Sequence, residues 1–338
     1  MDSDVAGTRI LVTGATGFLG QASALALQAQ GAVVLGAGRS REAIARLEEG
    51  GLRMRSLALE SAEQVRACFD EFRPQAIVHC AAKSAPYGKR SDFVRANVEG
   101  TNHLLDESRR GGVQRFVHIS SPSIYCAGKA LDRTREDSPL PARAINTYAE
   151  TKREAERLVQ QASSAGLACV ILRPRAIYGP GDNALFPRLL AALKDGKLPI
   201  IGDGQNQIDL TYIDDATASI QLALTADERC LGKAYNITSG ESVRLWDLIA
   251  TLADRLGLER PRRRVSRRTA QVAAACLEAL HRTFRRSGEP RLTRHSVDSL
   301  SLDATLDISA ARRDLQYAPR ISVNEGVERF LASLGVSA

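Results

Sequence analysis

Tyr148 and Lys152 are the two side chains whose types and spacing most directly suggest chemistry. They stand at positions i and i+4 of Tyr148-Ala-Glu-Thr-Lys152, so both lie on one face of a helix. A phenol has a reference pKa of about 10, and a neighbouring ammonium lowers that pKa because it favours the phenolate. The pair therefore predicts that Tyr148 donates and accepts a proton near neutral pH.

A glycine-rich turn near the N-terminus suggests a second kind of chemistry, the binding of a pyrophosphate. Gly14-Ala-Thr-Gly17-Phe-Leu-Gly20 follows an apolar segment at 9–13 and opens an expected helix. Glycines let the backbone turn tightly and approach a phosphate, whose charge then sits at the helix N-terminus. The turn predicts a dinucleotide site, and a purely structural turn is the alternative.

Arg39 bears on which dinucleotide would bind. An NAD site typically has an acidic residue about 20 residues past the turn, but here the second strand ends Gly36-Ala-Gly38-Arg39-Ser40. An arginine can pair with a 2′-phosphate. We therefore expect NADP(H) to be preferred and NAD(H) to remain possible, the alternative being that Arg39 is a solvated loop charge.

Alternating strands and helices would position these residues. Short apolar strands are predicted at 9–13, 32–35, 53–59, 75–80, 114–120 and 168–173, and helices at 21–30, 41–49, 61–72, 91–110 and 147–165. This alternation is typical of an α/β fold, a Rossmann-type doubly wound parallel sheet.

The rhythm changes after Tyr178. Helices are predicted at 185–195, from 214 and at 243–256, with strands at 207–213 and 234–238. We predict a nucleotide-binding domain at 1–180 and a smaller substrate-binding lobe at 181–338, with parts of 207–240 folding back onto the first domain.

Composition excludes several classes. The chain has 338 residues, a net charge of +7 and no apolar run near the roughly 18 residues that span a bilayer. Its N-terminus lacks the features of a secretion signal, so we expect a cytoplasmic protein with reduced cysteines. Five histidines show no ligand spacing, and we expect no metal.

The basic excess lies in the C-terminal part. Six arginines fall within 260–268, and an alanine-rich segment at 269–284 carries Val272, Cys276, Leu277, Leu280 and Phe284 at near-helical spacing. One interpretation is a peripheral membrane contact through 260–286. The other, which we favour, is a lobe helix that packs on the core or caps the substrate pocket. The arginines lack interleaved aromatic residues, so we expect no nucleic-acid partner.

These features together resemble the extended branch of the short-chain dehydrogenase/reductase superfamily, nearly from end to end. The resemblance rests on the glycine turn, Ser120-Ser121-Pro-Ser123-Ile-Tyr125, Tyr148-x-x-x-Lys152, Asn97-Val-Glu-Gly100-Thr101 and Arg173-Pro-Arg-Ala-Ile-Tyr178-Gly-Pro. It implies a catalytic set of Ser121, Tyr148, Lys152 and Asn97, in which Lys152 holds the nicotinamide ribose and Asn97 supports Lys152. Ser123 is the alternative to Ser121 as the catalytic hydroxyl.

The same resemblance implies the cofactor contacts. They are Gly14, Thr16, Gly17, Phe18, Leu19, Gly20, Arg39, Ser40, Leu59, Ala81, Ala82, Tyr148, Lys152, Pro174, Ala176 and Ile177. The family often has an aspartate near the adenine after the third strand, and this chain has Ala58-Leu59 there. We therefore expect no contact of an aspartate with the adenine at this position.

Further motifs indicate which subgroup of the superfamily the chain resembles. Sugar-nucleotide epimerases and dehydratases carry a phosphate-binding arginine where this chain has Ile208. Asp209-Leu-Thr-Tyr-Ile-Asp, Pro86-Tyr-Gly-Lys89 and Gly181-Asp182-Asn-Ala-Leu-Phe-Pro-Arg188 instead look like the 3β-hydroxysteroid dehydrogenase-like subgroup, which includes sterol dehydrogenases and reductases of long-chain β-keto acids. Substrate contacts are expected from Lys83, Tyr87, Ser123, Tyr178 and Arg188.

We therefore predict an oxidoreductase that interconverts a secondary alcohol and a ketone on a largely apolar, sterol-like, polyketide-like or long-chain β-keto substrate. The pocket should be lined by the 84–93, 178–190 and 265–285 regions. A sugar-nucleotide epimerase or dehydratase is the first alternative, and a non-catalytic NADP-sensing regulator is the second. A homodimer is a further expectation of the resemblance.

Overall fold

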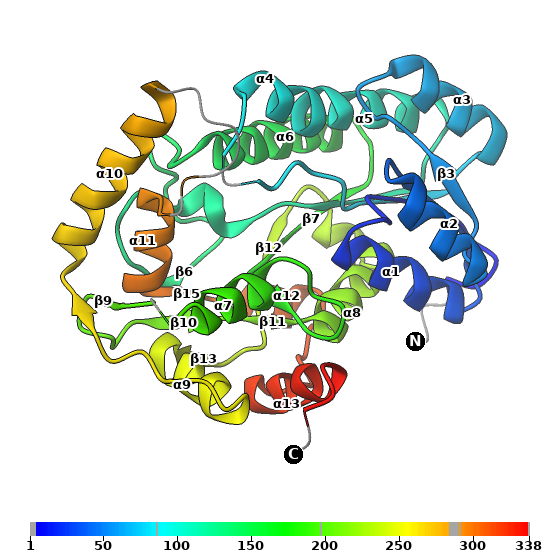
Figure 1. Ribbon diagram of the computed structural model, residues 1–338. Coiled ribbons are helices and arrows are strands. Elements are labelled where there is room, and N and C mark those ends of the chain that lie inside the picture. The colour runs from blue at the N-terminus through cyan, green and yellow to red at the C-terminus, as the bar shows by residue number, and fades with distance from the viewer. Residues whose placement is uncertain (1–4, 86, 197, 284–289, 291, 337–338) are drawn as a thin grey trace.

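The main sheet has seven parallel strands. The computed structural model describes residues 5–85, 87–196, 198–283, 290 and 292–336. The strand order is β12-β7-β5-β4-β1-β2-β3, and every neighbouring pair is parallel. The strands are β1 (Arg9–Thr13), β2 (Val33–Gly38), β3 (Met54–Ser56), β4 (Ala76–His79), β5 (Arg115–Ile119), β7 (Cys169–Pro174) and β12 (Ala234–Ile237). The predicted Rossmann-type sheet is confirmed (Figure 1).

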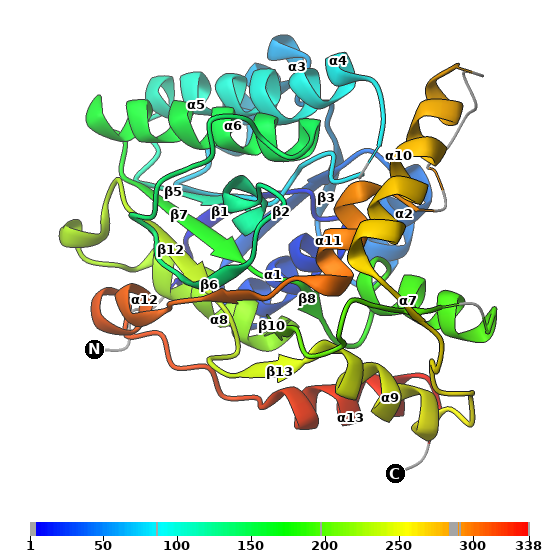
Figure 2. The same cartoon turned by 90° about the vertical axis from the view of Figure 1, so that its left-hand side faces the viewer.

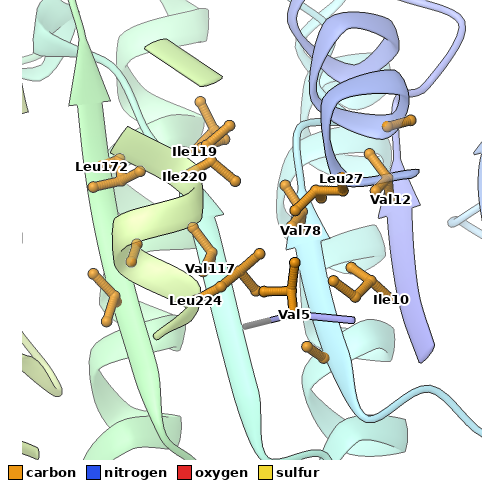
Figure 3. Close-up of a cluster of buried hydrophobic side chains, with 14 of the residues drawn as sticks. Val5, Ile10, Val12, Leu27, Val78, Val117, Ile119, Leu172, Ile220 and Leu224 are labelled. Atoms are coloured by element: carbon orange, nitrogen blue, oxygen red, sulfur yellow. The ribbon is translucent and has the colours of Figure 1, made fainter. Parts of the chain in front are cut away.

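Helices cover both faces of this sheet because the strands are apolar on both sides. Ile10 and Val12 pack into one core and Leu11 into the other, as the two-residue period of a strand requires. The first core also holds residues of α1 (Phe18–Ala29), α2 (Arg41–Glu49) and α8 (Ile213–Leu224), whereas the second holds residues of α3 (Ala62–Phe72), α5 (Gly100–Arg110) and α6 (Thr147–Ser164). Figure 3 shows Ile220 and Leu224 of α8 lying over strand side chains such as Val117 and Leu172.

A smaller lobe lies beside the sheet (Figure 2). Its strands form a mixed sheet of order β13-β10-β15-β6, comprising β13 (Ser242–Arg244), β10 (Gln207–Asp209), β15 (Ala304–Leu306) and β6 (Leu131–Thr134). Its helices include α7 (Leu185–Lys194), α9 (Leu245–Arg255), α10 (Arg267–Thr283), α11 (Arg294–Ser301) and α13 (Val323–Ser333). A separate apolar core, which contains Tyr178, Phe186, Trp246 and Phe330, holds the lobe together.

The chain crosses between the two parts more than once. Within residues 207–240, β10 belongs to the lobe sheet, whereas α8 packs on the main sheet and β12 extends it beside β7. The strand predicted at 207–213 is in fact two, because β11 (Thr211–Tyr212) leaves β10 to pair with β8 (Ile177–Tyr178).

Two other predicted elements differ in detail. The strand expected at 53–59 spans only 54–56, since the chain turns away to place Leu57 and Leu59 in the core. The helix expected at 91–110 comprises α4 (Arg90–Phe93), a π-helical segment at Val94–Glu99 and α5. A π-helical turn inside a helix is rare and often marks a functional site, and this one contains Asn97.

Helix α10 presents its larger apolar residues to solvent. Ala270 and Ala274 are buried against the lobe, whereas Val272, Leu277 and Leu280 are 66%, 40% and 49% exposed. The expectation that these larger residues pack on the core or cap the pocket is therefore wrong. Small alanines allow close approach to α11, and the bulkier side chains point away. Phe284 lies outside the described residues.

Candidate active site

A cavity of about 1550 Å³ lies between the carboxyl edge of the main sheet and the lobe. Its lining includes the turn after β1, the segments that follow β4, β5 and β7, the first half of α6, and residues of α7 and α11. A site for one small ligand usually measures about 300–1,000 Å³. The cavity therefore has room for a dinucleotide and a substrate together.

The glycine turn has the shape that a bound pyrophosphate needs. Gly14 has φ +72°, and a Cβ there would lie 2.7 Å from the Ala81 backbone nitrogen. A Cβ on Gly20 would meet the Gly14 carbonyl oxygen at 2.2 Å, so these two positions admit only glycine. Gly17 differs, because its Cβ would meet only that oxygen at 3.3 Å. The N-terminus of α1, which starts at Phe18, opens into the cavity, and the residues present therefore fit a dinucleotide.

The adenosine end of the expected cofactor site holds a carboxylate, that of Glu60, although the second strand ends without one. Arg39 and Glu60 both line the cavity, and Arg39 Nη1 lies 3.7 Å from Glu60 Oε1. The pairing of Gly38 with Ser56 brings the ends of β2 and β3 together and so places the two charges side by side. The expectation that no carboxylate stands near this site is therefore wrong. Ser40 caps α2 by accepting a hydrogen bond from the Ala43 amide.

Backbone forms the remaining walls of the predicted cofactor site. Thr16 packs against Gly38, and Leu19, Leu59, Ala81, Ala82, Pro174, Ala176 and Ile177 all line the cavity. Ala176 has φ +45°, in the left-handed region that an alanine seldom adopts. Such strain persists where the surrounding structure enforces it, often at binding sites.

Tyr148 and Ser121 meet inside the cavity. Both residues belong to the lining, and the Ser121 hydroxyl lies close enough to the Tyr148 phenol to lower its pKa. Burial has the larger effect, so the pKa of the Tyr148 phenol is raised. The depression of this pKa that we expected from Lys152 is not found, because the Lys152 ammonium lies against the Ile119 carbonyl and His118 instead. The phenol is protonated at neutral pH.

Lys152 is buried beneath the same wall. Its Nζ donates a hydrogen bond of 2.5 Å to the Ile119 carbonyl and lies 3.4 Å from His118 Nε2. Burial lowers the pKa of the ammonium to about 8, although Glu156 one turn along α6 acts in the opposite direction. Lys152 thus lies at the floor of the cavity with a proton that it can lose near pH 8.

Asn97 acts on Lys152 less directly than we expected. Its Oδ1 accepts a hydrogen bond of 2.7 Å from the Lys83 amide, and its Nδ2 donates to the Lys83 carbonyl and to Thr151 Oγ1. Among the described residues it has no direct bond to Lys152 and does not line the cavity. Asn97 therefore positions α6 through Thr151, and it is a positioning residue.

A buried ion pair fixes the back of the site. Arg173 on β7 pairs with Glu156 on α6, and both side chains are 5% exposed. Glu156 also accepts a hydrogen bond of 2.7 Å from Ser120, next to Ser121. Arg173 further bonds the Tyr125 hydroxyl. These contacts join β5, β7 and α6 directly behind the catalytic face.

The predicted substrate residues fall into two groups. Ser123 and Arg188 line the cavity. Lys83 instead pairs with Asp92 at 3.5 Å, and Tyr87 packs edge-on against His281. Tyr178 is fully buried in the lobe core, where its hydroxyl donates to the Val323 carbonyl. The prediction that Lys83, Tyr87 and Tyr178 contact the substrate is therefore corrected, because none of them lines the cavity.

The lobe side of the cavity holds residues that sequence reasoning missed. None of the described residues 265–283 lines it; residues of the segment 290–304 do so instead, with Leu292, His295 and Leu300. Of the described residues in the 84–93 region, only Ser84 takes part. Arg175, which no motif marked as a site residue, also lines the same cavity. Ile208 is buried in the cavity wall, so this wall is apolar.

Residues 10–238 match the model of the NAD dependent epimerase/dehydratase family. The chain belongs to this family. The predicted membership in the extended branch of the short-chain dehydrogenases/reductases is confirmed, and so is the prediction of an NAD(P)-dependent oxidoreductase.

Three known proteins illustrate the relationship. The chain is 36% identical to a 2-alkyl-3-oxoalkanoate reductase of Stenotrophomonas maltophilia, over 96% of this chain and 99% of the relative. It is 29% identical to a decarboxylating sterol-4-alpha-carboxylate 3-dehydrogenase of Schizosaccharomyces pombe, over 79% and 80% of the two chains. A dTDP-glucose 4,6-dehydratase of Streptomyces venezuelae, solved with NAD bound, matches with a TM-score of 0.75 and 26% identity over 97% of each chain.

Two further features of the described residues concern membranes and metals. Their helices include none with the length and apolar character of a transmembrane segment. Within the same residues, no group of three or more His, Cys, Asp or Glu side chains is arranged to hold a metal ion.

Proposed function

We propose that the protein reduces a ketone to a secondary alcohol on a largely apolar substrate, with NADPH preferred over NADH. The observation that carries the proposal is the placement of the Tyr148 and Ser121 hydroxyls next to each other in the lining of the cavity. A protonated phenol beside a second hydroxyl is the arrangement that a carbonyl oxygen needs as it becomes an alcohol.

The roles of the residues follow from this geometry. The nicotinamide cofactor, when bound, supplies the hydride. Tyr148 gives its phenol proton to the carbonyl oxygen, and Ser121 donates a hydrogen bond to the same oxygen. The raised pKa of Tyr148 keeps the phenol protonated at neutral pH, which is the form that reduction requires. Lys152 would hold the ribose hydroxyls, for which its Nζ must leave the Ile119 carbonyl.

The cofactor preference depends on Arg39. Its side chain is 65% exposed and its ion pair with Glu60 is long, at 3.7 Å. An exposed pair of this kind contributes little free energy. Arg39 is therefore available to a 2′-phosphate, and Glu60 limits the size of the preference without reversing it.

The substrate class follows from the lobe side of the cavity. Ile208, Leu210, Leu292 and Leu300 make this wall apolar, and Ile208 offers no charge to a nucleotide diphosphate. The names of the Stenotrophomonas and Schizosaccharomyces relatives both describe oxidation or reduction at a position 3 in a carboxylated, hydrocarbon-rich compound. We therefore favour a long-chain 3-oxo compound over a sugar nucleotide.

Ligand-induced stabilisation followed by a turnover assay tests the proposal. With NADPH present, a long-chain 3-oxo acid or a 3-ketosterol should raise the melting temperature and be reduced, as measured by the loss of absorbance of NADPH. UDP-glucose and dTDP-glucose should do neither. Stabilisation by either sugar nucleotide, with none by the apolar ketones, would assign the protein to the epimerases and dehydratases instead.

A further inference from the structure

Arg175 is a half-buried cation at the cavity, without an ion pair among the described residues. Its Nε is fully buried and has no hydrogen-bond partner, and no carboxylate among the described residues lies within ion-pair distance of its side chain. Burial lowers the pKa of the guanidinium, with Asp209 and Cys126 acting against that shift. A guanidinium keeps its charge at neutral pH even so. An unpaired charge in such a place is costly unless a ligand compensates it.

Two more polar atoms of the cavity lining are equally without partners. They are His295 Nδ1 and Ser123 Oγ, both fully buried. His295 lies close enough to Arg175 for the guanidinium to lower its pKa. Ser123 follows Ser121 on the segment after β5. Each of these atoms can donate a hydrogen bond, His295 Nδ1 in the tautomer that carries the proton.

The carboxylates nearby are, by contrast, fully engaged. Asp209 accepts hydrogen bonds from the Ser242 hydroxyl and the Leu306 amide. Asp298 accepts them from Arg267 and from Gln271 Nε2. Asp182 accepts three backbone N–H groups at the start of α7. Arg175, His295 and Ser123 thus present unpartnered donors, whereas these three carboxylates already accept hydrogen bonds from other groups.

The main sheet places these donors next to the reacting carbonyl. Ile119 of β5 lies opposite Leu172 of β7, and the Ser120 amide donates to the Leu172 carbonyl. The segments that leave the two strands therefore run side by side, one with Ser121 and Ser123, the other with Arg175. In a 3-oxo acid a single carbon separates the ketone from the carboxylate, so the two groups need adjacent subsites.

We propose that Arg175, with His295 and Ser123, binds the carboxylate of a 3-oxo or 3-hydroxy acid substrate. This inference rests on the proposed function and names the polar end of its substrate. The apolar wall around Ile208, Leu292 and Leu300 takes the hydrocarbon chain. Arg175 is thereby a specificity-determining residue that distinguishes a free acid from an ester or a simple ketone.

The test compares 3-hydroxydecanoate with its methyl ester, since these alcohols are stable in solution. The kcat/KM for oxidation by NADP⁺ should favour the acid in the unmodified protein. A charge-assisted hydrogen bond contributes roughly 1.5–3 kcal/mol, so Arg175→Met should lower kcat/KM for the acid about tenfold to a hundredfold and leave the ester within about threefold. Calorimetric titration of the acid against the NADP⁺ complex should show the same loss of affinity.

Two variants control for charge and for folding. Arg175→Lys keeps the charge and should retain part of the preference for the acid. Lys129→Met removes an exposed cation of the same cavity and should leave the ratio of acid to ester unchanged. Equal loss on acid and ester in Arg175→Met, with NADP⁺ affinity retained, would overturn the subsite while the proposed function stands.

The remaining outcomes separate the two proposals. Oxidation of neither compound, together with no reduction of any apolar ketone, would contradict the proposed function itself. Binding of UDP-glucose that is lost in Arg175→Met, without binding of 3-hydroxydecanoate, would show that the anion is a phosphate and would overturn the carboxylate assignment.

A second observation, independent of the cavity, concerns the outer face of α10. Val272, Cys276 and Leu280 stand at successive i and i+4 positions, and all three are exposed. Arg268 lies one turn before Val272 in the same row. Figures 1 and 2 both place α10 at the periphery with α11 on its inner side. The helix therefore offers an apolar stripe that nothing in the described chain covers.

Unpaired arginines lie at the start of this stripe. Arg262, Arg263, Arg264 and Arg268 are exposed and have no ion pair among the described residues. An apolar helix face flanked by arginines suits the surface of an anionic bilayer, where the apolar side chains enter the headgroup boundary. We infer that the α10 face contacts anionic lipid, close to the α11 residues that line the substrate cavity.

Co-sedimentation with vesicles tests this contact. The protein should bind vesicles that contain phosphatidylglycerol, lose that binding at high salt, and ignore vesicles of phosphatidylcholine alone. The double substitution V272E/L280E should weaken binding at least about tenfold, because burial of each side chain contributes roughly 1.5–3 kcal/mol. Leu334→Glu, at an exposed apolar residue after α13, is the matched control and should have no effect.

Two results would contradict the lipid contact. One is the absence of binding to anionic vesicles by the unmodified protein. The other is a concentration-dependent dimer, seen by analytical ultracentrifugation, that V272E/L280E dissociates, since that result would assign the face to a second copy of the chain.

Discussion

Arg173 and Arg175 leave the end of β7 with only Pro174 between them, yet they enter opposite environments. Arg173 faces the back of the catalytic wall, where Glu156 and Tyr125 satisfy its guanidinium. Arg175 faces the lobe side of the cavity, where its Nε has no partner. The contrast separates two kinds of buried charge. A charge that the protein itself satisfies holds the fold, whereas a charge left unsatisfied marks a place for a ligand.

The free energies of unfolding of two variants give the largest expected difference between the two arginines. Arg173→Met leaves Glu156 buried without its partner and should lower the free energy of unfolding by about 3–5 kcal/mol. Arg175→Met removes a desolvated charge that has no ion pair, so it should change that free energy by less than about 1 kcal/mol. Urea unfolding of both variants measures the difference. Similar losses in the two would show that Arg175 is structural as well.

Cofactor selectivity extends the comparison to Arg39 at the adenosine end of the cavity. Arg39 pairs with Glu60 and can exchange this partner for a phosphate. Arg39→Ala should weaken NADPH binding about tenfold to a hundredfold, the range of a charge-assisted bond to phosphate, and should leave NADH nearly unchanged. Glu60→Gln should strengthen NADPH binding, because it removes the competing carboxylate. Fluorescence titration of NADPH and NADH against the unmodified protein and both variants measures these affinities, and equal affinities for the two cofactors in the unmodified protein would refute the preference.

The two catalytic side chains Lys152 and Tyr148 also differ in the direction in which burial shifts their pKa values. The pKa of Lys152 is lowered to about 8 and that of Tyr148 is raised. Hence kcat/KM for NADPH should fall as pH rises through about 8, because Lys152 loses the charge that would hold the ribose while Tyr148 keeps its proton. Lys152→Arg, which stays charged, should move this alkaline limb to higher pH. An unmoved limb would assign the titration to another group.

Two serines on one short segment give the smallest expected difference. The Ser121 hydroxyl lies close enough to Tyr148 to lower the pKa of the phenol, whereas Ser123 Oγ has no hydrogen-bond partner, and both residues line the cavity. Ser121→Ala should lower kcat by about tenfold, the value of roughly 1.4 kcal/mol for one hydrogen bond. Ser123→Ala should lower kcat less and act mainly on KM for an acidic substrate. Steady-state kinetics of both variants decides between the roles, and the reverse order would exchange them.

The sequence allowed the sheet and the phosphate turn to be predicted because both depend on local patterns. Apolar runs identify the strands of the main sheet, and the spacing of Gly14, Gly17 and Gly20 identifies the turn. Ser121, Tyr148 and Lys152 also lie within recognisable local motifs. Such features need no knowledge of which distant segments meet.

The rest depended on contacts between distant segments. Glu60 reaches Arg39 only through the pairing of β2 with β3, and His295 reaches Arg175 only because α11 packs over the cavity. The pKa of Tyr148 depends on how deeply the fold buries it, which the spacing to Lys152 does not reveal. The prediction that the larger apolar residues of α10 pack on the core was wrong for a similar reason, since the helical period does not show which side of a helix meets the core.

Single-turnover reduction in Tyr148→Phe tests the central claim most directly. With NADPH and an identified ketone, hydride transfer should be about 10²–10⁴-fold slower than in the unmodified protein, which is the contribution of a positioned proton donor. The affinity for NADPH should stay within about twofold, because the phenol proton is given to the substrate. A rate within threefold of the unmodified protein would show that the proton comes from another group and would contradict the assignment of the active site.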